Sequence, residues 1–422
     1  GSKAQVYVET QATTPKGKAG ARLAVRLLDA NGRAVAQKNL TANAQGTAAV
    51  QLNIANAKAW SPEQPYLYTL EVSLYQGNKL ADRLRQCVGI RTVAVSKEHG
   101  FQLNGQSRKF KGVCLHHDLG PLGAAVNKAA IIRQIRLMKD MGVDAIRTSH
   151  NMPSQMQMQV CDSMGMMVMA ESFDAWKEPK VKNGYNLFYD QWWRKDLENL
   201  IRGHRNHPSI VMWSIGNEIP EQWNKEGAQR AKDMTDYCHR LDNTRPVTCG
   251  GDNPKANTEC GFYAALDVPG FNYRVNLYDE LISKQRQGFI LGSETTSTVS
   301  SRGVYKFPVD EKKMATYKDG QCSSYDVECC GWSNLPDDDL IAQDDRSFTI
   351  GQFIWTGIDY LGEPTPYYSY WPSRSSYFGA VDLAGLPKDR FYLYRSVWNE
   401  KQPTLHLLPH WTWPGREGQQ TP

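Results

Sequence analysis

The stretch "VMWSIGNEIPEQW", from Val211 to Trp223, is a run of apolar residues that stops at a polar pair. The apolar part is typical of a strand buried on both faces, as in a parallel sheet. Its end, Asn217 next to Glu218, tolerates water, but an amide beside a carboxylate is equally suited to catalysis. The rest of the sequence indicates whether this strand end is only solvated or takes part in a reaction.

The same pattern repeats from about residue 96 onward, where apolar strand-like runs alternate with amphipathic helical segments. Eight such strands begin at Phe110, Asp144, Met167, Ile210, Pro246, Asp267, Gly288 and Ile350. This number and alternation predict a closed (β/α)8 TIM barrel. An open doubly wound sheet is the weaker alternative, because no GxGxxG motif follows the first strand.

One helix and one loop region stand out between these strands. The helix "NKAAIIRQIRLMKDMG" places Ile131, Ile135 and Met138 on one stripe and ends at Gly142. The segment 300–347 is long and irregular, so we expect it to form loops and short helices at the barrel mouth.

The first part of the chain has a different period. "RLAVRLLD" places Leu23, Val25 and Leu27 on one face, and in "LYTLEVSLY" Glu71 and Ser73 fall on the face opposite the apolar residues. Alternation of period two with turn residues between the runs predicts a small antiparallel β-sandwich. The chain is therefore expected to be multi-domain, with a sandwich at residues 1–94 and the barrel at residues 95–422.

Composition excludes several classes of protein. At 422 residues the chain exceeds what one compact core usually holds. The net charge of +5 is small and its basic residues are scattered, so nucleic acid is not an expected partner. No apolar run is long enough to span a membrane, and the start does not resemble a signal peptide. The nine cysteines lack zinc-site spacing and are expected to be free thiols.

In a (β/α)8 barrel the active site forms at the carboxyl ends of the strands. The polar and aromatic residues at these ends are His116, His117, Asp118, Arg147, His150, Asn151, Glu171, Asn217, Glu218, Asn272, Tyr273, Glu294, Trp355 and Asp359. Sugars need hydrogen bonds for their hydroxyls and a flat apolar face for stacking, so this set predicts a carbohydrate site.

Two carboxylates end the fourth and seventh strands, Glu218 and Glu294. These strands lie three apart in a ring of eight, so both side chains can face the mouth, as glycoside hydrolysis requires. Arg147 and Tyr273 are available to hold Glu294 ionised, which predicts a lowered pKa and a nucleophile. Glu218 would then be the acid, with a raised pKa.

Each supporting residue also has a plain structural reading. Arg147 can neutralise buried carboxylates, His116 and His150 can be core histidines, and Trp355 can be barrel packing. For Glu171 two interpretations are left open, a structural role and a position beside a metal ion.

The motifs "RTSHNMPS", "WSIGNE", "GFNY" and "LGSE", in this order, resemble glycoside hydrolase family two, the β-galactosidase, β-glucuronidase and β-mannosidase group. The resemblance implies a retaining double displacement with Glu218 as general acid/base and Glu294 as nucleophile. It also implies that the first ninety or so residues are an immunoglobulin-like β-sandwich, and that the family's usual preceding jelly-roll domain is missing here. Arg147, His150, Asn217, Tyr273 and Trp355 match substrate-contacting or nucleophile-supporting positions. His116 matches less closely, since Leu115 stands where the family commonly has Arg.

The sugar is inferred from departures within the family. The Asn-x-Lys pair with which family β-glucuronidases grip the uronate is missing where it should fall, at "DLAGLPK" with Lys388. Asn399 and Lys401 form such a pair, but in a helix-like segment away from the mouth. The segment 358–390 looks like the β-galactosidase branch, so a β-galactoside is expected first, then a β-glucuronide, then a β-mannoside.

The remaining expectations are broader. Ser297 stands where some β-galactosidases of the family have a His, and "AESFDAW" shows no trace of their magnesium ligation, so no metal or other cofactor is expected. A carbohydrate-binding fragment without catalysis is the alternative of another class. The resemblance is compatible with a homo-oligomer and with a periplasmic or secreted bacterial protein, but the residues themselves fix neither.

Overall fold

The computed structural model describes residues 2–13, 20–372 and 375–419. The chain forms two compact units: Gly1–Thr92 with the short segments Asp162–Gly165 and Arg205–Ser209, and the remaining residues from Val93. The domain limit at residue 94 stays a prediction. None of the helices in the described part of the chain has the length and apolar character that crossing a bilayer requires.

The first unit contains two antiparallel sheets. A two-stranded sheet pairs β1 (Ser2–Gln11) with β4 (Thr47–Ala57). A four-stranded sheet has the order β3 (Ala34–Thr41), β2 (Arg22–Leu28), β5 (Tyr68–Gln76) and β6 (Lys79–Val88). The core includes Leu23, Val25 and Leu27, the face that the period-two pattern predicts.

One residue of this unit differs from the simple alternating pattern. Glu71 lies on the face opposite the apolar core but is only 1% exposed, because Arg26, Arg83 and Arg85 cover its carboxylate as ion pairs. Three cations therefore hold the pKa of Glu71 below its ordinary value, with the hydrogen bond from Arg85 as the largest cause. The polar face of a strand can thus be buried by long charged side chains.

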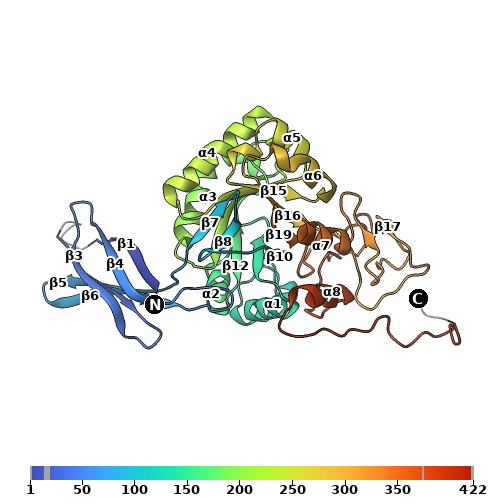
Figure 1. The fold of residues 1–422 in the computed structure, drawn as a ribbon, viewed down its shortest axis with the longest axis horizontal. Coiled ribbons are helices and arrows are strands. Elements are labelled where there is room, and N and C mark those ends of the chain that lie inside the picture. Colours follow the sequence, from blue (N-terminus) through green and yellow to red (C-terminus); the bar gives the residue numbers. More distant parts are fainter. Residues whose placement is uncertain (1, 14–19, 373–374, 420–422) are drawn as a thin grey trace. The chain divides into compact units, whose positions relative to one another are not determined.

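The second unit is a closed barrel of eight strands, as the sequence predicts (Figure 1). Around the barrel they are β10 (Phe110–Leu115), β11 (Ala145–Thr148), β12 (Met167–Glu171), β13 (Ile210–Asn217), β14 (Val247–Gly251), β15 (Val268–Asn272), β16 (Ile290–Thr295) and β19 (Thr349–Ile354). All eight pairings are parallel, so the carboxyl ends of the strands gather at one end of the barrel.

Helices cover the outside of the barrel (Figure 1). They are α1 (Lys128–Met141), α2 (Gln155–Met164), α3 (Tyr189–His204), α4 (Lys225–Leu241), α5 (Pro254–Glu259), α6 (Tyr278–Leu281), α7 (Pro336–Asp345) and α8 (Asp389–Trp398). Helix α1 buries the predicted stripe of Ile131, Ile135 and Met138, and Gly142 ends it in a left-handed conformation. Glycine adopts that conformation without steric cost.

Short elements complete the unit. A three-stranded antiparallel sheet precedes the barrel, with β7 (Val93–Ser96), β8 (Gly100–Leu103) and β9 (Gln106–Ser107). Between β16 and α7 the chain is mostly loop and contains the small pair β17 (Lys312–Lys313) and β18 (Glu328–Cys329). All nine cysteines are free thiols, and seven of them are buried.

Candidate active site

A cavity of about 480 Å³ opens at the carboxyl ends of the barrel strands. Both strand-end carboxylates, Glu218 and Glu294, line it. The other lining residues are His116, His150, Asp174, Lys180, Asn217, Asp252, Tyr273, Arg274, Trp332, Trp355 and Glu363. Five of the six residues that the sequence suggests as substrate contacts are therefore in this cavity, and the sixth, Arg147, lies outside it.

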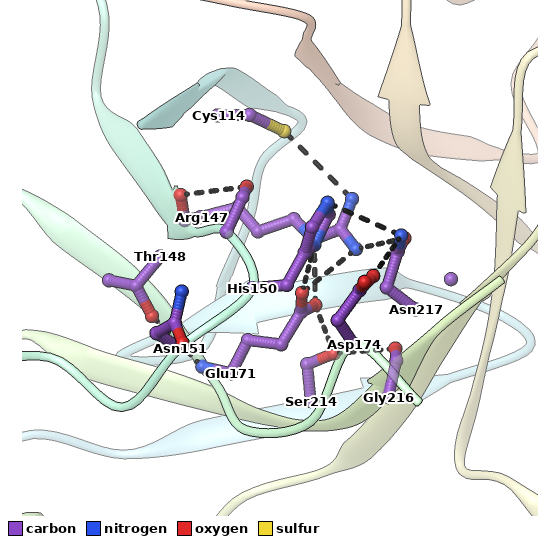
Figure 2. A network of polar contacts seen from close by, with 12 residues as sticks. Cys114, Arg147, Thr148, His150, Asn151, Glu171, Asp174, Ser214, Gly216 and Asn217 are labelled. Carbon is purple, nitrogen blue, oxygen red and sulfur yellow. Dashed lines mark hydrogen bonds and ion pairs between the residues drawn. The ribbon is translucent and has the colours of Figure 1, made fainter. Parts of the chain in front are cut away.

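Arg147 is buried and organises the floor of the site (Figure 2). Its Nη1 lies 2.9 Å from Glu294 Oε2, and its Nη2 donates to Asn217 Oδ1 over 2.7 Å. Its Nε and Nη2 also pair with the two carboxylate oxygens of Glu171, at 2.8 and 3.1 Å. This guanidinium fixes two carboxylates and one amide together, and because it is fully buried it does not itself reach the cavity.

Glu171 is held on all sides. Besides Arg147, its carboxylate accepts from Ser214 Oγ at 2.6 Å, and His150 Nδ1 lies 2.6 Å away (Figure 2). Burial alone would raise the pKa of Glu171, but Arg147 and His150 hold it below its ordinary value. These contacts give Glu171 a structural role, that of an anion which orients Arg147 and His150.

His150 and Asn217 are ordered by the same network. Asn217 Nδ2 lies 3.3 Å from His150 Nε2, and the His150 ring stacks on Trp355 with centroids 5.3 Å apart. His116 contacts the edge of Trp355 and stacks on Tyr360 at 3.9 Å. Burial lowers the pKa of His116 to about 3, so this imidazole is neutral at physiological pH.

Glu294 has a phenol as well as a cation beside it. Tyr273 Oη donates to Glu294 Oε1 over 2.7 Å and lies 2.6 Å from Ser297 Oγ. Nevertheless, burial raises the pKa of Glu294 to about 7, although Arg147 and Tyr273 each lower it. The expected net lowering is therefore wrong, because the loss of water around this carboxylate outweighs both partners.

Glu218 has neither of those partners. Asn272 Nδ2 donates to its Oε1 over 2.9 Å. Burial and, after it, the negative charge of Glu294 raise the pKa of Glu218 to about 8. The raised pKa agrees with the sequence-based expectation for an acid. The two carboxyl groups interact, so their titration steps belong to the pair, and both pKa values lie well above the ordinary value of a Glu.

The backbone at the mouth is strained where it presents these groups. Glu218, Tyr273, Arg274 and Glu363 line the cavity, and each has a positive φ between 43° and 57°. Such conformations cost about 1–3 kcal/mol each in non-glycine residues and cluster at functional sites. Gly250 is needed for another reason, since a Cβ there would lie 2.8 Å from Asn272 Oδ1 and 3.0 Å from Arg147 Nη2.

Several strand-end residues do not reach the cavity. Asp359 is buried in an ion pair with Lys388, and its carboxylate also accepts from the backbone of Gly379. His117, Asp118 and Asn151 line a separate cavity of about 270 Å³ beside the loops that follow β10 and β11.

The sequence argument missed Asn272 as a partner of Glu218, although it named this residue as a strand end. It also missed cavity residues that come from loops, namely Asp174, Lys180, Asp252, Arg274, Trp332 and Glu363. Asp252 directly follows β14 and Arg274 directly follows Tyr273, so the strand-end rule could have found these two.

A closed parallel barrel with two carboxylates in one mouth cavity is the arrangement of a glycoside hydrolase. Residues 93–367 match the family model described as glycosyl hydrolases family 2, TIM barrel domain, and residues 2–91 match the model described as glycosyl hydrolases family 2. The chain belongs to glycosyl hydrolase family 2.

Relatives of known sequence and structure agree with this. The chain is 39% identical to a β-galactosidase of Bacteroides ovatus, covering 93% of this chain and 51% of that protein. It is 34% identical to a putative β-glucuronidase of Formosa agariphila, covering 98% of this chain and 40% of that protein. A β-glycosidase structure from Bacteroides vulgatus is 32% identical with a TM-score of 0.84, covering 98% of this chain and 56% of that one. The chain thus spans about half the length of the curated relatives it matches.

Proposed function

We propose that this protein is a retaining glycoside hydrolase that cleaves terminal β-D-galactosides. The observation that supports this most strongly is that Glu218 and Glu294, from the fourth and seventh barrel strands, line one cavity in unlike surroundings. Retention requires two carboxyl groups on opposite sides of the scissile bond, one as acid and one as nucleophile.

In the first step a carboxylate oxygen of Glu294 attacks the anomeric carbon. The bond from that carbon to the leaving oxygen breaks, and Glu218 gives its proton to this oxygen. The products are a glycosyl ester of Glu294 and a free alcohol, with Glu218 ionised. In the second step Glu218 takes a proton from water, whose oxygen attacks the anomeric carbon and releases Glu294.

The surroundings of the two carboxyl groups support these roles. Arg147 and Tyr273 each contact one oxygen of Glu294, which favours its anionic form relative to Glu218. Among the described residues, Glu218 receives one side-chain hydrogen bond, from the amide of Asn272, and it faces the charge of Glu294, which favours its protonated form. This ordering matches a nucleophile that must be ionised and an acid that must carry a proton.

The remaining proposed sugar contacts are His116, His150, Asn217 and Trp355. Asn217 and His150 present polar atoms to the cavity, and Trp355 presents an indole. We assign Arg147 and Tyr273 to the support of Glu294. No metal or cofactor takes part in the proposed steps.

The positions of Lys388 and of the Asn399 and Lys401 pair favour a galactoside over a uronate, because neither supplies the family's uronate clamp to this cavity. Lys388, the cation nearest to the family's uronate clamp in sequence, is buried, and its Nζ is taken up by Asp359 and by the carbonyls of Ser300 and Tyr377. Asn399 donates to the carbonyl of Asp140 at the end of α1, and its neighbour Glu400 pairs with Lys111 at the amino end of β10. That places the second Asn-x-Lys sequence at the opposite end of the barrel from the cavity.

A β-glucuronidase remains the second candidate, favoured by the Formosa agariphila relative, and a β-mannosidase is third. A panel of nitrophenyl β-galactoside, β-glucuronide and β-mannoside tests the order. We expect release of nitrophenol fastest from the galactoside, and none with Glu294→Gln. Faster cleavage of the glucuronide would overturn the sugar assignment.

A carbohydrate-binding fragment without catalysis is the alternative of another class. The panel should therefore be run with this chain and with a longer chain that includes the domains of its relatives. Activity on none of the three glycosides with either chain, together with measurable galactose binding, would favour the binding role over hydrolysis.

A further inference from the structure

Arg274 is a charged residue of the cavity that has no partner of its own. Among the residues that the structure describes, no hydrogen bond or ion pair joins its guanidinium to another group. The other charged residues of the cavity are engaged: Lys180 with Asp174, Glu294 with Arg147, Glu218 with Asn272, Asp252 with Gln222 and Glu363 with Tyr360. An unengaged guanidinium in a carbohydrate cavity is available to a ligand.

The backbone holds Arg274 at the mouth. It follows Tyr273 directly, both residues have left-handed φ values of 57°, and the Tyr273 amide donates to the Glu294 carbonyl over 2.6 Å. The guanidinium is therefore carried on a turn that is fixed to the proposed nucleophile strand. Its side chain is partly buried, so it does not extend freely into solvent.

The barrel order divides the cavity into two halves. Glu218 follows the fourth strand and Glu294 lies on the seventh, so the two carboxyl groups separate the fifth and sixth strands from the other arc. The larger arc, of β19, β10, β11 and β12, supplies the side chains suited to the sugar, Trp355, His116, His150 and Asp174. The smaller arc supplies Asp252 after β14 and Arg274 after β15.

Trp332 also lines the cavity. It comes from the loop between β18 and α7, and its Nε1 lies 3.4 Å from Ser297 Oγ, just after β16. Trp332 is half-buried and adds a stacking surface to the cavity that also holds the guanidinium of Arg274.

We propose that Arg274 forms a leaving-group subsite that binds a carboxylate or sulfate on the aglycone. This rests on the proposed function, since the leaving group lies across the line of the two carboxyl groups from the sugar. The natural substrate is then a β-galactoside joined to an acidic sugar or another acidic group. Arg binds a carboxylate or sulfate through two parallel hydrogen bonds to two of its oxygen atoms. A neutral aglycone has no such pair of charged oxygen atoms.

The test compares two galactosides that differ in aglycone charge, anionic carboxyumbelliferyl β-galactoside and neutral methylumbelliferyl β-galactoside. The readout is the ratio of their kcat/KM values in wild type, in Arg274→Gln and in Arg274→Lys. Arg136→Gln, a change at an exposed arginine on α1, is the matched control. Comparing this ratio between variants cancels the different leaving-group acidities.

We expect Arg274→Gln to lower the anionic-to-neutral ratio about tenfold, the effect of losing one charge-assisted contact. Arg274→Lys should retain part of the preference, because it keeps the charge without the fork. The neutral substrate reports whether each variant still folds and turns over. An unchanged ratio in Arg274→Gln would overturn the proposal.

Two further arms separate this subsite from the sugar assignment. Methylumbelliferyl β-galacturonide carries its charge on the sugar, so a loss confined to this substrate would place the anion in the sugar half and contradict the proposal. If wild type cleaves glucuronides instead, the anionic-to-neutral ratio of kcat/KM is measured with carboxyumbelliferyl and methylumbelliferyl β-glucuronide. If it cleaves none, calorimetric titration with the two galactosides gives the ratio of Kd values, and equal ratios in wild type and Arg274→Gln refute the subsite.

Discussion

Replacement of Glu218 by Gln is the perturbation that best separates the two proposed carboxyl roles. The side chain keeps its shape but can neither give nor take a proton. Burial raises the pKa of Glu218 to about 8 from an ordinary value of 4.5. At pH 7 an ordinary Glu is about 0.3% protonated and a group with a pKa near 8 is about 90% protonated, so the site enriches the acid form about 300-fold.

The expected loss therefore depends on the leaving group. With phenyl β-galactoside, whose phenoxide leaves poorly without a proton, Glu218→Gln should lower kcat/KM by about 10²–10⁴-fold. With dinitrophenyl β-galactoside, whose leaving group needs little protonation, the rate of the first step should fall less than about tenfold. The second step still lacks its base, so stopped-flow absorbance should show a burst of dinitrophenol followed by slow turnover.

The pH profile gives the second readout. For wild type, kcat/KM should fall below about pH 7 as Glu294 gains a proton and above about pH 8 as Glu218 loses one. Glu218→Gln should remove the basic limb and keep the acidic one. Glu226→Gln, a change at an exposed carboxylate on α4, is the control. Equal losses for the phenyl and dinitrophenyl substrates, or a basic limb that persists, would refute the assignment of Glu218 as acid.

Three other predictions follow from the same contacts. Arg147→Met leaves two buried carboxylates without their cation, so it should abolish turnover and lower the free energy of unfolding by about 3–5 kcal/mol, measured by denaturant unfolding against the exposed Arg136→Met; a loss near zero would contradict this role. Tyr273→Phe removes a contact that lowers the pKa of Glu294, so the acidic limb of the pH profile should move to higher pH and kcat should fall about tenfold or more, and an unmoved limb would count against the contact. Because the pKa of Glu218 is raised in the folded protein, its ionisation lowers the free energy of unfolding progressively from about pH 4.5 to about pH 8, and the loss stays constant above that. Glu218→Gln should therefore raise Tm more at about pH 9 than at about pH 5. The reverse order in calorimetry would contradict the raised pKa.

The sequence predicts the barrel well because its strands are buried on both faces and read as apolar runs. The ends of those runs place Asn217, Glu218 and Glu294 at the same end of the barrel, and the closed order puts the two Glu side chains in one cavity. These are consequences of local pattern and parallel topology alone.

Other features depend on depth and on distant partners. The pKa of Glu294 is raised because the effect of burial outweighs that of Arg147. The neighbouring residues in the sequence do not indicate how deeply Glu294 is buried. Asp359 ends a strand, yet Lys388, from a loop that returns to it, removes it from the site. Trp332 and Glu363 reach the cavity from irregular loops, where no periodic pattern exists to place them.

The central claim is that Glu294 forms a covalent bond to the sugar while Glu218 donates a proton to the leaving oxygen. Incubation with dinitrophenyl β-galactoside that carries fluorine at C2 slows both steps and lets the intermediate accumulate, so that mass spectrometry of a proteolytic digest can locate it. We expect one fluorogalactosyl group on the peptide that contains Glu294, and none in Glu294→Gln. Turnover of the unmodified galactoside with no adduct, or an adduct on any other residue, would contradict the account.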